Sequence, residues 1–202
     1  MGEESGEGSG GGSGEDAVGG TVENAAWVAE WGDPCRDCGF DWSIAPDAAI
    51  AAVEGVLAEL AALLDGHTGD ETAPDASWSA KAYVFHVADN LYIFAERLEG
   101  VAAGAPALVA PYDQDELAAA RHYESMSVQA ALWSVRASVA VWAPAARASL
   151  RRDVTYFHPE RGALTAAEIT RGPAHDAVHH AWDVRRAVQS SSPLCRPAPP
   201  GG

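Results

Sequence analysis

The sequence is poor in basic residues, in cysteine and in long apolar runs, and each shortage excludes a class of protein. Its 202 residues hold 13 lysines and arginines against 29 aspartates and glutamates, for a formal net charge of −16. We expect no nucleic-acid or membrane partner, because phosphates would repel such a chain. No apolar run is long enough to cross a bilayer. The acidic, glycine-rich start has neither the basic region nor the apolar segment of a signal peptide. These absences predict a cytoplasmic protein.

Three cysteines are too few for a disulfide framework, and in the cytoplasm they are expected as thiols or metal ligands. Cys35 and Cys38 form a CxxC pair followed by Gly39, a turn typical of zinc knuckles. There is no second CxxC, so further ligands would have to be histidines, Cys195 or residues of a second chain in a homodimer. The alternatives are a redox pair, which favours a βαβ unit absent here, and two reduced thiols in an aromatic turn.

Composition divides the chain into four stretches within a length that suits one domain. Residues 1–23 are glycine-rich and acidic, which predicts a disordered tail. Residues 24–43 hold the CxxC pair among large aromatic side chains. Residues 44–189 carry a helical period, and residues 190–202 are rich in serine, proline and glycine, which predicts a flexible C-terminal tail.

Apolar residues recur every three to four positions in four long segments, which predicts four amphipathic helices. These segments are residues 46–65, 77–100, 127–150 and 165–188. Thr165 and Glu168 fit a capping box, Pro144 predicts a kink, and Gly172–Pro173 predicts a break or kink. A short helix is expected over 113–123, and strand signals are close to nil. The predicted fold class is all-α, an up-down four-helix bundle with a short extra helix.

The last predicted helix carries three of the chain's seven histidines. His175 and His179 are four residues apart, so they share a face, and Val178 and Trp182 turn that face inward. Two imidazoles on adjacent turns can hold one metal ion from one side, and a buried imidazole needs a partner. His86, at the edge of the second helix's apolar stripe, is by itself either a hydrogen-bonded core residue or a ligand.

The order of these residues resembles the DinB/YfiT superfamily of metal-binding four-helix bundles. The resemblance covers roughly residues 46–189 and rests on Trp78 and His86 in one helix and on His-x-x-x-His-His with Trp182–Asp183 in the last. The stretches 113–123 and 159–162 also look like connections of that superfamily. The resemblance implies that His86, His175 and His179 bind one divalent metal and leave one position open. Zinc is the first candidate, with nickel or iron as alternatives.

The resemblance also implies thiol chemistry, because several members transfer a low-molecular-weight thiol and one branch isomerises maleylpyruvate with mycothiol. A bound metal depresses the pKa of a thiol, so thiolate is available at neutral pH. The hypothesis is a metal-dependent thiol S-transferase that conjugates a mycothiol-type thiol to an electrophilic small molecule in detoxification or secondary metabolism. The alternatives are a mycothiol-dependent isomerase and a non-catalytic metal- or small-molecule-binding bundle.

Five further positions bear on this site, and no catalytic residue is assigned beyond two candidates, His158 and Asp183. Asp183 is expected either to hold a ring N–H of His179 or to pair with Arg185 or Arg186. His158 is expected either as a solvated loop residue or as an acid–base group over the metal. His180 is expected to point aside. Cys35 and Cys38 are candidates for a second metal site, or for capping the histidine site.

Overall fold

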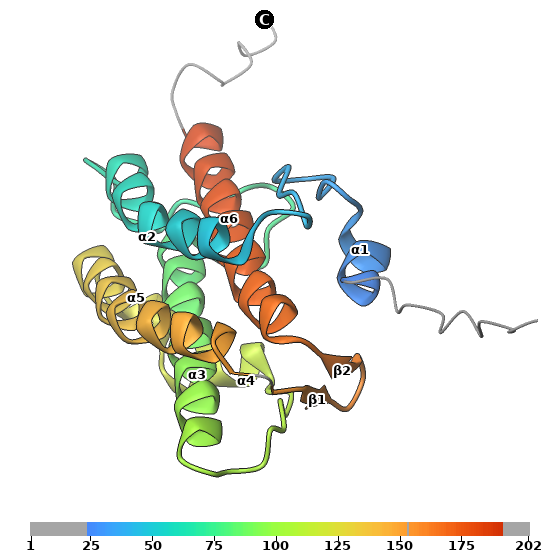
Figure 1. The fold of residues 1–202 in the computed structure, drawn as a ribbon. Helices are drawn as coiled ribbons and strands as arrows, with labels where there is room; N and C mark the ends of the chain where they lie inside the picture. Colours follow the sequence, from blue (N-terminus) through green and yellow to red (C-terminus); the bar gives the residue numbers. More distant parts are fainter. Residues whose placement is uncertain (1–23, 153, 192–202) are drawn as a thin grey trace, which may run out of the picture.

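The computed structural model describes residues 24–152 and 154–191, so the predicted N-terminal tail, residues 192–202 of the predicted C-terminal tail and Cys195 lie outside the described residues. Within them the chain forms six α-helices, one 3-10 turn and two short strands (Figure 1). In chain order these are α1 (Ala25–Trp31), α2 (Pro46–Leu63), α3 (Ala80–Ala102), α4 (Gln114–Ala120), η1 (Tyr123–Ser125), α5 (Val128–Leu150), β1 (Tyr156–His158), β2 (Gly162–Leu164) and α6 (Ala166–Ser190). None of the described helices combines the length and the apolar character needed to cross a membrane.

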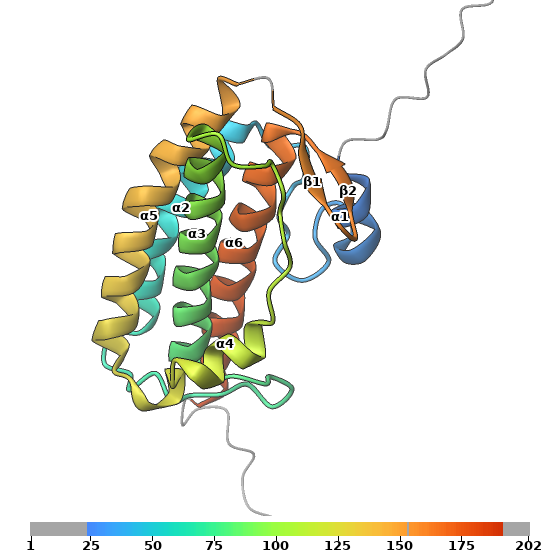
Figure 2. The ribbon, with the colours of Figure 1, turned by 90° about the horizontal axis from the view of Figure 1, so that it is seen from below.

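The four long helices pack as the predicted four-helix bundle, which is confirmed. Helices α2 and α3 each pack on both α5 and α6. The two consecutive helices α2 and α3 therefore lie on opposite sides of the α5–α6 pair, as Figure 2 shows with α3 in front and α2 behind. Helix α6 thus has one side for α2 and another for α3, and it also carries the histidine-rich stretch.

Local capping signals fix where the long helices begin. The hydroxyls of Ser79 and Ser127 accept hydrogen bonds from backbone N–H groups in the first turns of α3 and α5. The carboxylate of Asp113 does the same for α4. Thr165 and Glu168 form both halves of a capping box at the start of α6, as predicted. Such side-chain acceptors satisfy N–H groups that have no partner within the helix.

One local expectation was wrong, and one alternative of another is excluded. The stretch around His158, where the sequence shows no strand signal and a loop is expected, is an antiparallel hairpin in which Tyr156 pairs with Leu164 and the backbone of Phe157 also bonds to residues 107 and 109. Its strands have three residues each, too few for an alternating pattern to show in the sequence. Pro173 does not break α6, which continues through it as one helix. The proline is buried, and packing holds the helix together despite the lost N–H donor.

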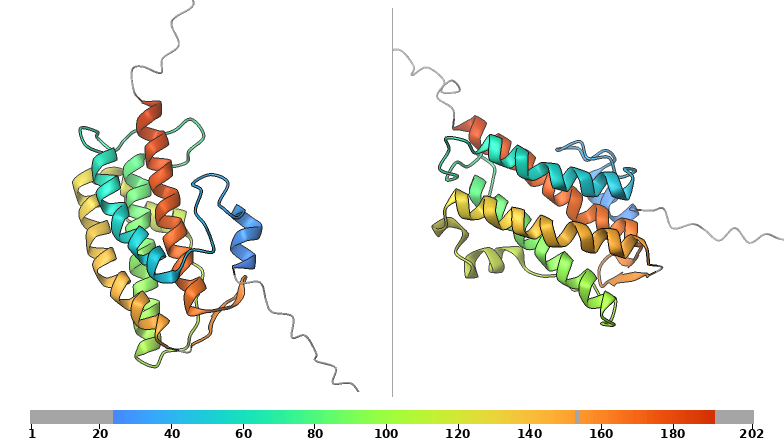
Figure 3. Two further views of the ribbon diagram at one scale, coloured as in Figure 1. Left: turned by 45° about the horizontal axis from the view of Figure 1, so that its top comes forward. Right: turned by 60° about the vertical axis from the view of Figure 1, so that its left-hand side comes forward.

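The N-terminal segment (residues 24–44), which includes α1, is docked against α6 and the hairpin (Figure 3, left). The backbone N–H of Asn24 donates to the buried carboxylate of Glu168 at 2.8 Å. At the other end of the segment, Nε of Arg171 donates to the carbonyl of Ile44 at 2.8 Å. Between these anchors, Trp27 lies directly over Gly172 of α6. The segment is therefore held at several points along the first half of α6.

Replacing Gly172 by alanine is expected to loosen the N-terminal segment without weakening the bundle. A Cβ at this position would lie 2.9 Å from the indole of Trp27. That indole is stacked on Trp42 and covered by the guanidinium of Arg161, so it has little freedom to move aside. Alanine is otherwise favoured over glycine inside a helix by about 1 kcal/mol. We expect faster proteolysis within residues 24–44 and an undiminished free energy of unfolding for the bundle.

The matched control is Gly55→Ala in α2, where an added Cβ meets no atom within 4 Å. It should raise the free energy of unfolding by roughly 0.5–1 kcal/mol and leave the proteolysis of the segment unchanged. Equal proteolysis of the two variants would show that Trp27 is not clamped against α6.

Candidate metal centre

Helix α6 carries two interleaved pairs of metal-ligating side chains. His175 and His179 form one pair with a spacing of four residues, and Asp176 and His180 form the other. Successive residues of a helix point about 100° apart, so the two pairs look in different directions. The first pair meets the N-terminal segment, and the second meets α3.

The pair that meets α3 belongs to what we call the His86 group: His86, Asp176 and His180. One ligand atom from each residue lies within 4.8 Å of the others. Nε2 of His86 is 3.3 Å from Oδ2 of Asp176, and Nε2 of His180 is 3.4 Å from Oδ1 of the same carboxylate. Two imidazoles from two helices therefore converge on one carboxylate.

The burial of the His86 side chain indicates that its ring needs a further partner, such as a metal ion. The side chain is 2% exposed; within the part of the chain that the structure describes, its Nδ1 makes no hydrogen bond and its Nε2 has the carboxylate of Asp176 at 3.3 Å as an ion-pair partner. Burying an imidazole with so little polar support is costly, and a metal ion bound by Nε2 and the Asp176 carboxylate would reduce that cost. Two imidazoles and a carboxylate are a donor set found around zinc, iron and nickel. The residues present fit a divalent metal.

The charges around His180 also fit a metal ion at the His86 group. Burial by itself would lower its pKa, but the carboxylates of Asp176 and Asp183 raise the pKa of His180 to about 9. Burial likewise opposes ionisation of Asp176, yet His86 and His180 hold the pKa of its carboxyl well below the usual range. The carboxylate of Asp176 is therefore an anion between two imidazoles, and a metal cation would replace the proton on His180.

Side chains behind the His86 group hold its ligands in place. Nδ1 of His180 donates to Asp183 at 2.9 Å, which leaves Nε2 facing Asp176. Nδ2 of Asn90 donates to Asp176 at 2.8 Å, and Asn90 in turn accepts from the hydroxyl of Tyr112 at 3.1 Å. Such supporting contacts orient a metal's ligands and tune its affinity.

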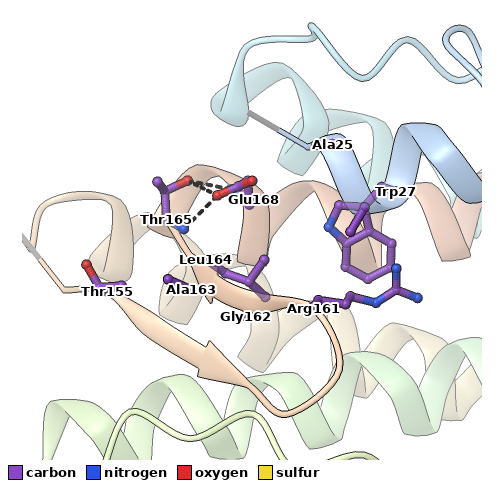
Figure 4. Close-up of a pocket in the computed structure, with 10 residues that line it drawn as sticks. Ala25, Trp27, Thr155, Arg161, Gly162, Ala163, Leu164, Thr165 and Glu168 are labelled. Carbon is purple, nitrogen blue, oxygen red and sulfur yellow. Dashed lines mark hydrogen bonds between the residues drawn. The ribbon is translucent and has the colours of Figure 1, made fainter. Parts of the chain in front are cut away.

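Three cavities of about 270, 270 and 160 Å³ adjoin the His86 group, and Gln114 of α4 lines all three. A small molecule could reach the ligands there. A larger cavity, of about 710 Å³, lies between α1 and β2 (Figure 4). It is lined by Trp27, Arg161, Glu168 and several small residues, and none of the candidate ligands contributes to it. We therefore place the candidate reaction site at the smaller cavities.

The other pair of α6 belongs to what we call the cysteine–histidine group: Cys35, Cys38, His175 and His179. Burial and the nearby His179 lower the pKa of His175 to about 4, so its ring is neutral at pH 7. Burial raises the pKa of the Cys38 thiol to about 12 in the protein without metal. Both values describe donors that are uncharged at pH 7.

The predicted ligand set, His86, His175 and His179, is divided between the two groups. His86 meets Asp176 and His180, whereas His175 and His179 meet the cysteines. His180 was expected to point aside, but it is part of the His86 group. The sequence analysis missed Asp176 and His180 as a pair, although their spacing of four residues was a readable signal.

The two catalytic candidates have different surroundings. Asp183 accepts a hydrogen bond from His180, and it forms long ion pairs of 3.9 Å with Nε2 of His179 and with Nη1 of Arg186, so it meets one partner from each of the two expected alternatives. His158 accepts hydrogen bonds from the backbone N–H groups that follow it in the hairpin turn. It belongs to neither candidate group among the described residues.

No protein-family model matches the chain, and no curated protein matches it. Among solved structures, YfiT from Bacillus subtilis matches with a TM-score of 0.60 and 18% sequence identity. The match covers 73% of this chain and 90% of that one. The chain has the YfiT fold. The resemblance predicted from the sequence is thereby confirmed for the fold. YfiT has been described as a probable metal-dependent hydrolase with an unusual four-helix bundle topology.

Proposed function

We propose that the protein is a metal-dependent enzyme whose catalytic metal is held by His86, Asp176 and His180. The observation that carries the proposal is the convergence of these three side chains, from α3 and α6, beside three cavities. Three protein ligands leave positions for substrate, which distinguishes catalytic from structural metal sites. The likeness to YfiT supports a site of this class.

The reaction that we propose is transfer of a low-molecular-weight thiol, of the mycothiol type, to an electrophilic small molecule. A divalent metal at the His86 group supplies a Lewis acid that favours thiolate over thiol at neutral pH. The protein's own residues keep the site in shape: Asn90 and Asp183 fix the ligands, and Gln114 lines the approach. In the transfer the sulfur bonds to the electrophilic carbon, the leaving group departs with its electron pair, and the thiol proton passes to solvent.

Hydrolysis is the second candidate reaction, and the description of YfiT as a hydrolase favours it. The same group would serve it, because a metal with an open position also lowers the pKa of bound water. The two reactions differ in the nucleophile alone, so they are separated by whether turnover needs a thiol.

The test compares metal-loaded protein with protein treated with a chelator. With mycothiol and monochlorobimane, we expect the loaded protein to form conjugate above the uncatalysed rate, the chelated protein to lose this activity, and added zinc, nickel or iron to restore it. A parallel incubation with an activated ester and no thiol reports hydrolysis. Conjugation that persists undiminished after complete metal removal would contradict the proposal.

The remaining outcomes distinguish the alternatives. Ester cleavage without conjugation would assign the hydrolase, and mycothiol-dependent conversion of maleylpyruvate would assign the isomerase. Stoichiometric retention of metal and small molecule without any turnover would make the protein a non-catalytic binding bundle.

A further inference from the structure

A second group of ligating side chains lies on another flank of the same stretch of α6, where the N-terminal segment crosses the helix. It contains Cys35 and Cys38 from the segment and His175 and His179 from α6, with one ligand atom of each within 4.8 Å of the others. Cys35, His175 and His179 are buried, and Cys38 is half-buried. The cysteines and the histidines are far apart in sequence: 137 positions separate the nearest two, Cys38 and His175. Their convergence at one point calls for an explanation.

We propose that this cysteine–histidine group binds a structural zinc ion that fastens the N-terminal segment to α6. Four ligands of the Cys2His2 type close a tetrahedral zinc site without an open position. The inference does not rest on turnover at the His86 group, because the two groups share no ligand.

The distances within the group suit zinc. Sγ of Cys35 lies 3.7 Å from Nδ1 of His179. Zinc–sulfur and zinc–nitrogen bonds of about 2.3 and 2.0–2.1 Å, meeting at a tetrahedral angle, place the two atoms about 3.6 Å apart. A distance of 3.7 Å is long for a hydrogen bond donated by nitrogen or oxygen, and a hydrogen bond donated by sulfur is weak. The pair is therefore spaced as two ligands of one ion.

The turn that holds the cysteines is already shaped for a metal. The N–H of Cys35 donates to the carbonyl of Phe40 at 2.8 Å, and the N–H of Gly39 donates to the carbonyl of Cys35 at 2.9 Å. Gly39 has a φ of +75°, in the left-handed region that glycine enters without strain. These bonds fold the CxxCG sequence back on itself and present both sulfurs to α6.

Polar partners on α6 do not account for the burial of the two imidazoles: Nε2 of His179 has Asp183 at 3.9 Å, and Nε2 of His175 has none within the described chain. Nε2 of His175 is buried and makes no hydrogen bond within the described chain. Aromatic rings enclose the pair: Trp31 packs on both rings, and Phe40 and Trp42 pack on His175. Two thiolates and two neutral imidazoles around Zn²⁺ carry no net charge, so the occupied site could lie in this apolar shell without an unpaired charge.

The proposed zinc would also shape the neighbouring site. The cavity of about 270 Å³ that adjoins Asp176 and His180 has Trp27, Glu30 and Trp31 of the N-terminal segment as one wall. A zinc ion that holds the segment on α6 would hold this wall in place. The closed site would therefore act as a positioning element for the open one.

The experiment replaces zinc by cobalt(II) in the full-length protein and records the absorption spectrum. We expect a thiolate-to-cobalt charge-transfer band and intense visible bands of tetrahedral cobalt, together with two metal equivalents per chain when both groups are filled. The double substitution Cys35→Ser/Cys38→Ser should abolish the charge-transfer band and one metal equivalent. His86→Ala should remove the other equivalent and leave the band unchanged.

Cys195→Ser is the matched control and should leave both the band and the metal content as in the unaltered protein. If the double variant does not fold, thiol titration of the Cys195→Ser protein gives the same answer, because two thiols should react only after chelation. No charge-transfer band, or a band that persists in the double variant, would overturn the proposal. So would two thiols that react equally fast with and without chelator.

Discussion

Replacing His86 by alanine is expected to abolish metal-dependent turnover while the bundle stays folded. The imidazole supplies one of three converging ligands, and the two that remain both come from α6. Two ligands from a single helix hold an ion from one side only, so we expect turnover to fall to that of the chelated protein. The backbone fold should survive, because the polar partner that the side chain loses within the described residues is Asp176, and no backbone group bonds to it. Metal analysis and the conjugation assay, with far-ultraviolet circular dichroism, check the three parts.

His67→Ala is the control for His86→Ala. His67 lies in the loop after α2, where it bonds to Glu71, and it belongs to neither ligand group in the described chain. Its replacement should leave metal content and turnover unchanged. Full turnover in the His86 variant would move the catalytic metal away from α3, and the remaining candidate would be the cysteine–histidine group.

The long helices could be predicted because their signals are local. Apolar residues recur with the helical period, and Ser79, Ser127 and Thr165 mark the starts of α3, α5 and α6 with capping side chains. The hairpin could not be predicted in the same way. Its strands are stabilised by pairing with each other and with residues 107–109, about fifty positions earlier in the chain. Contacts over that distance leave no periodic mark on three-residue strands.

Which pair of α6 side chains meets His86 could not be predicted from the sequence, for a different reason. That the histidines of α6 face inward followed from their apolar neighbours, but which of them meets α3 depends on how α6 is rotated about its axis. A shift of one residue is a rotation of about 100°, enough to exchange His175 and His179 for Asp176 and His180. The N-terminal segment settles the rotation, since Trp27 lies on Gly172 and the cysteine turn lies on His175 and His179. Once that flank is covered, the other pair is the one that faces His86.

Trp142 of α5 should be among the costliest side chains to remove, and its loss should leave the metal groups intact. The indole is fully buried in the bundle, and replacement of such a residue by alanine costs about 3–5 kcal/mol through lost burial and the cavity left behind. Helix α5 contributes no residue to either ligand group among the described residues. We therefore expect Trp142→Ala to lower the denaturation midpoint strongly while the folded fraction keeps the metal content of the unaltered protein.

Two further variants separate burial from the identity of the side chain at position 142. Trp133, on the same helix, is 70% exposed, and Trp133→Ala should change the free energy of unfolding by no more than about 0.5 kcal/mol. Trp142→Phe should cost less than Trp142→Ala, because a phenyl ring fills most of the space and the indole N–H has no partner within the described chain to lose. Urea titrations with a common slope would give the ranking. A Trp142→Ala variant no less stable than Trp133→Ala would mean that α5 is not packed as the bundle requires, and the framework that brings α3 to α6 would have to be revised with it.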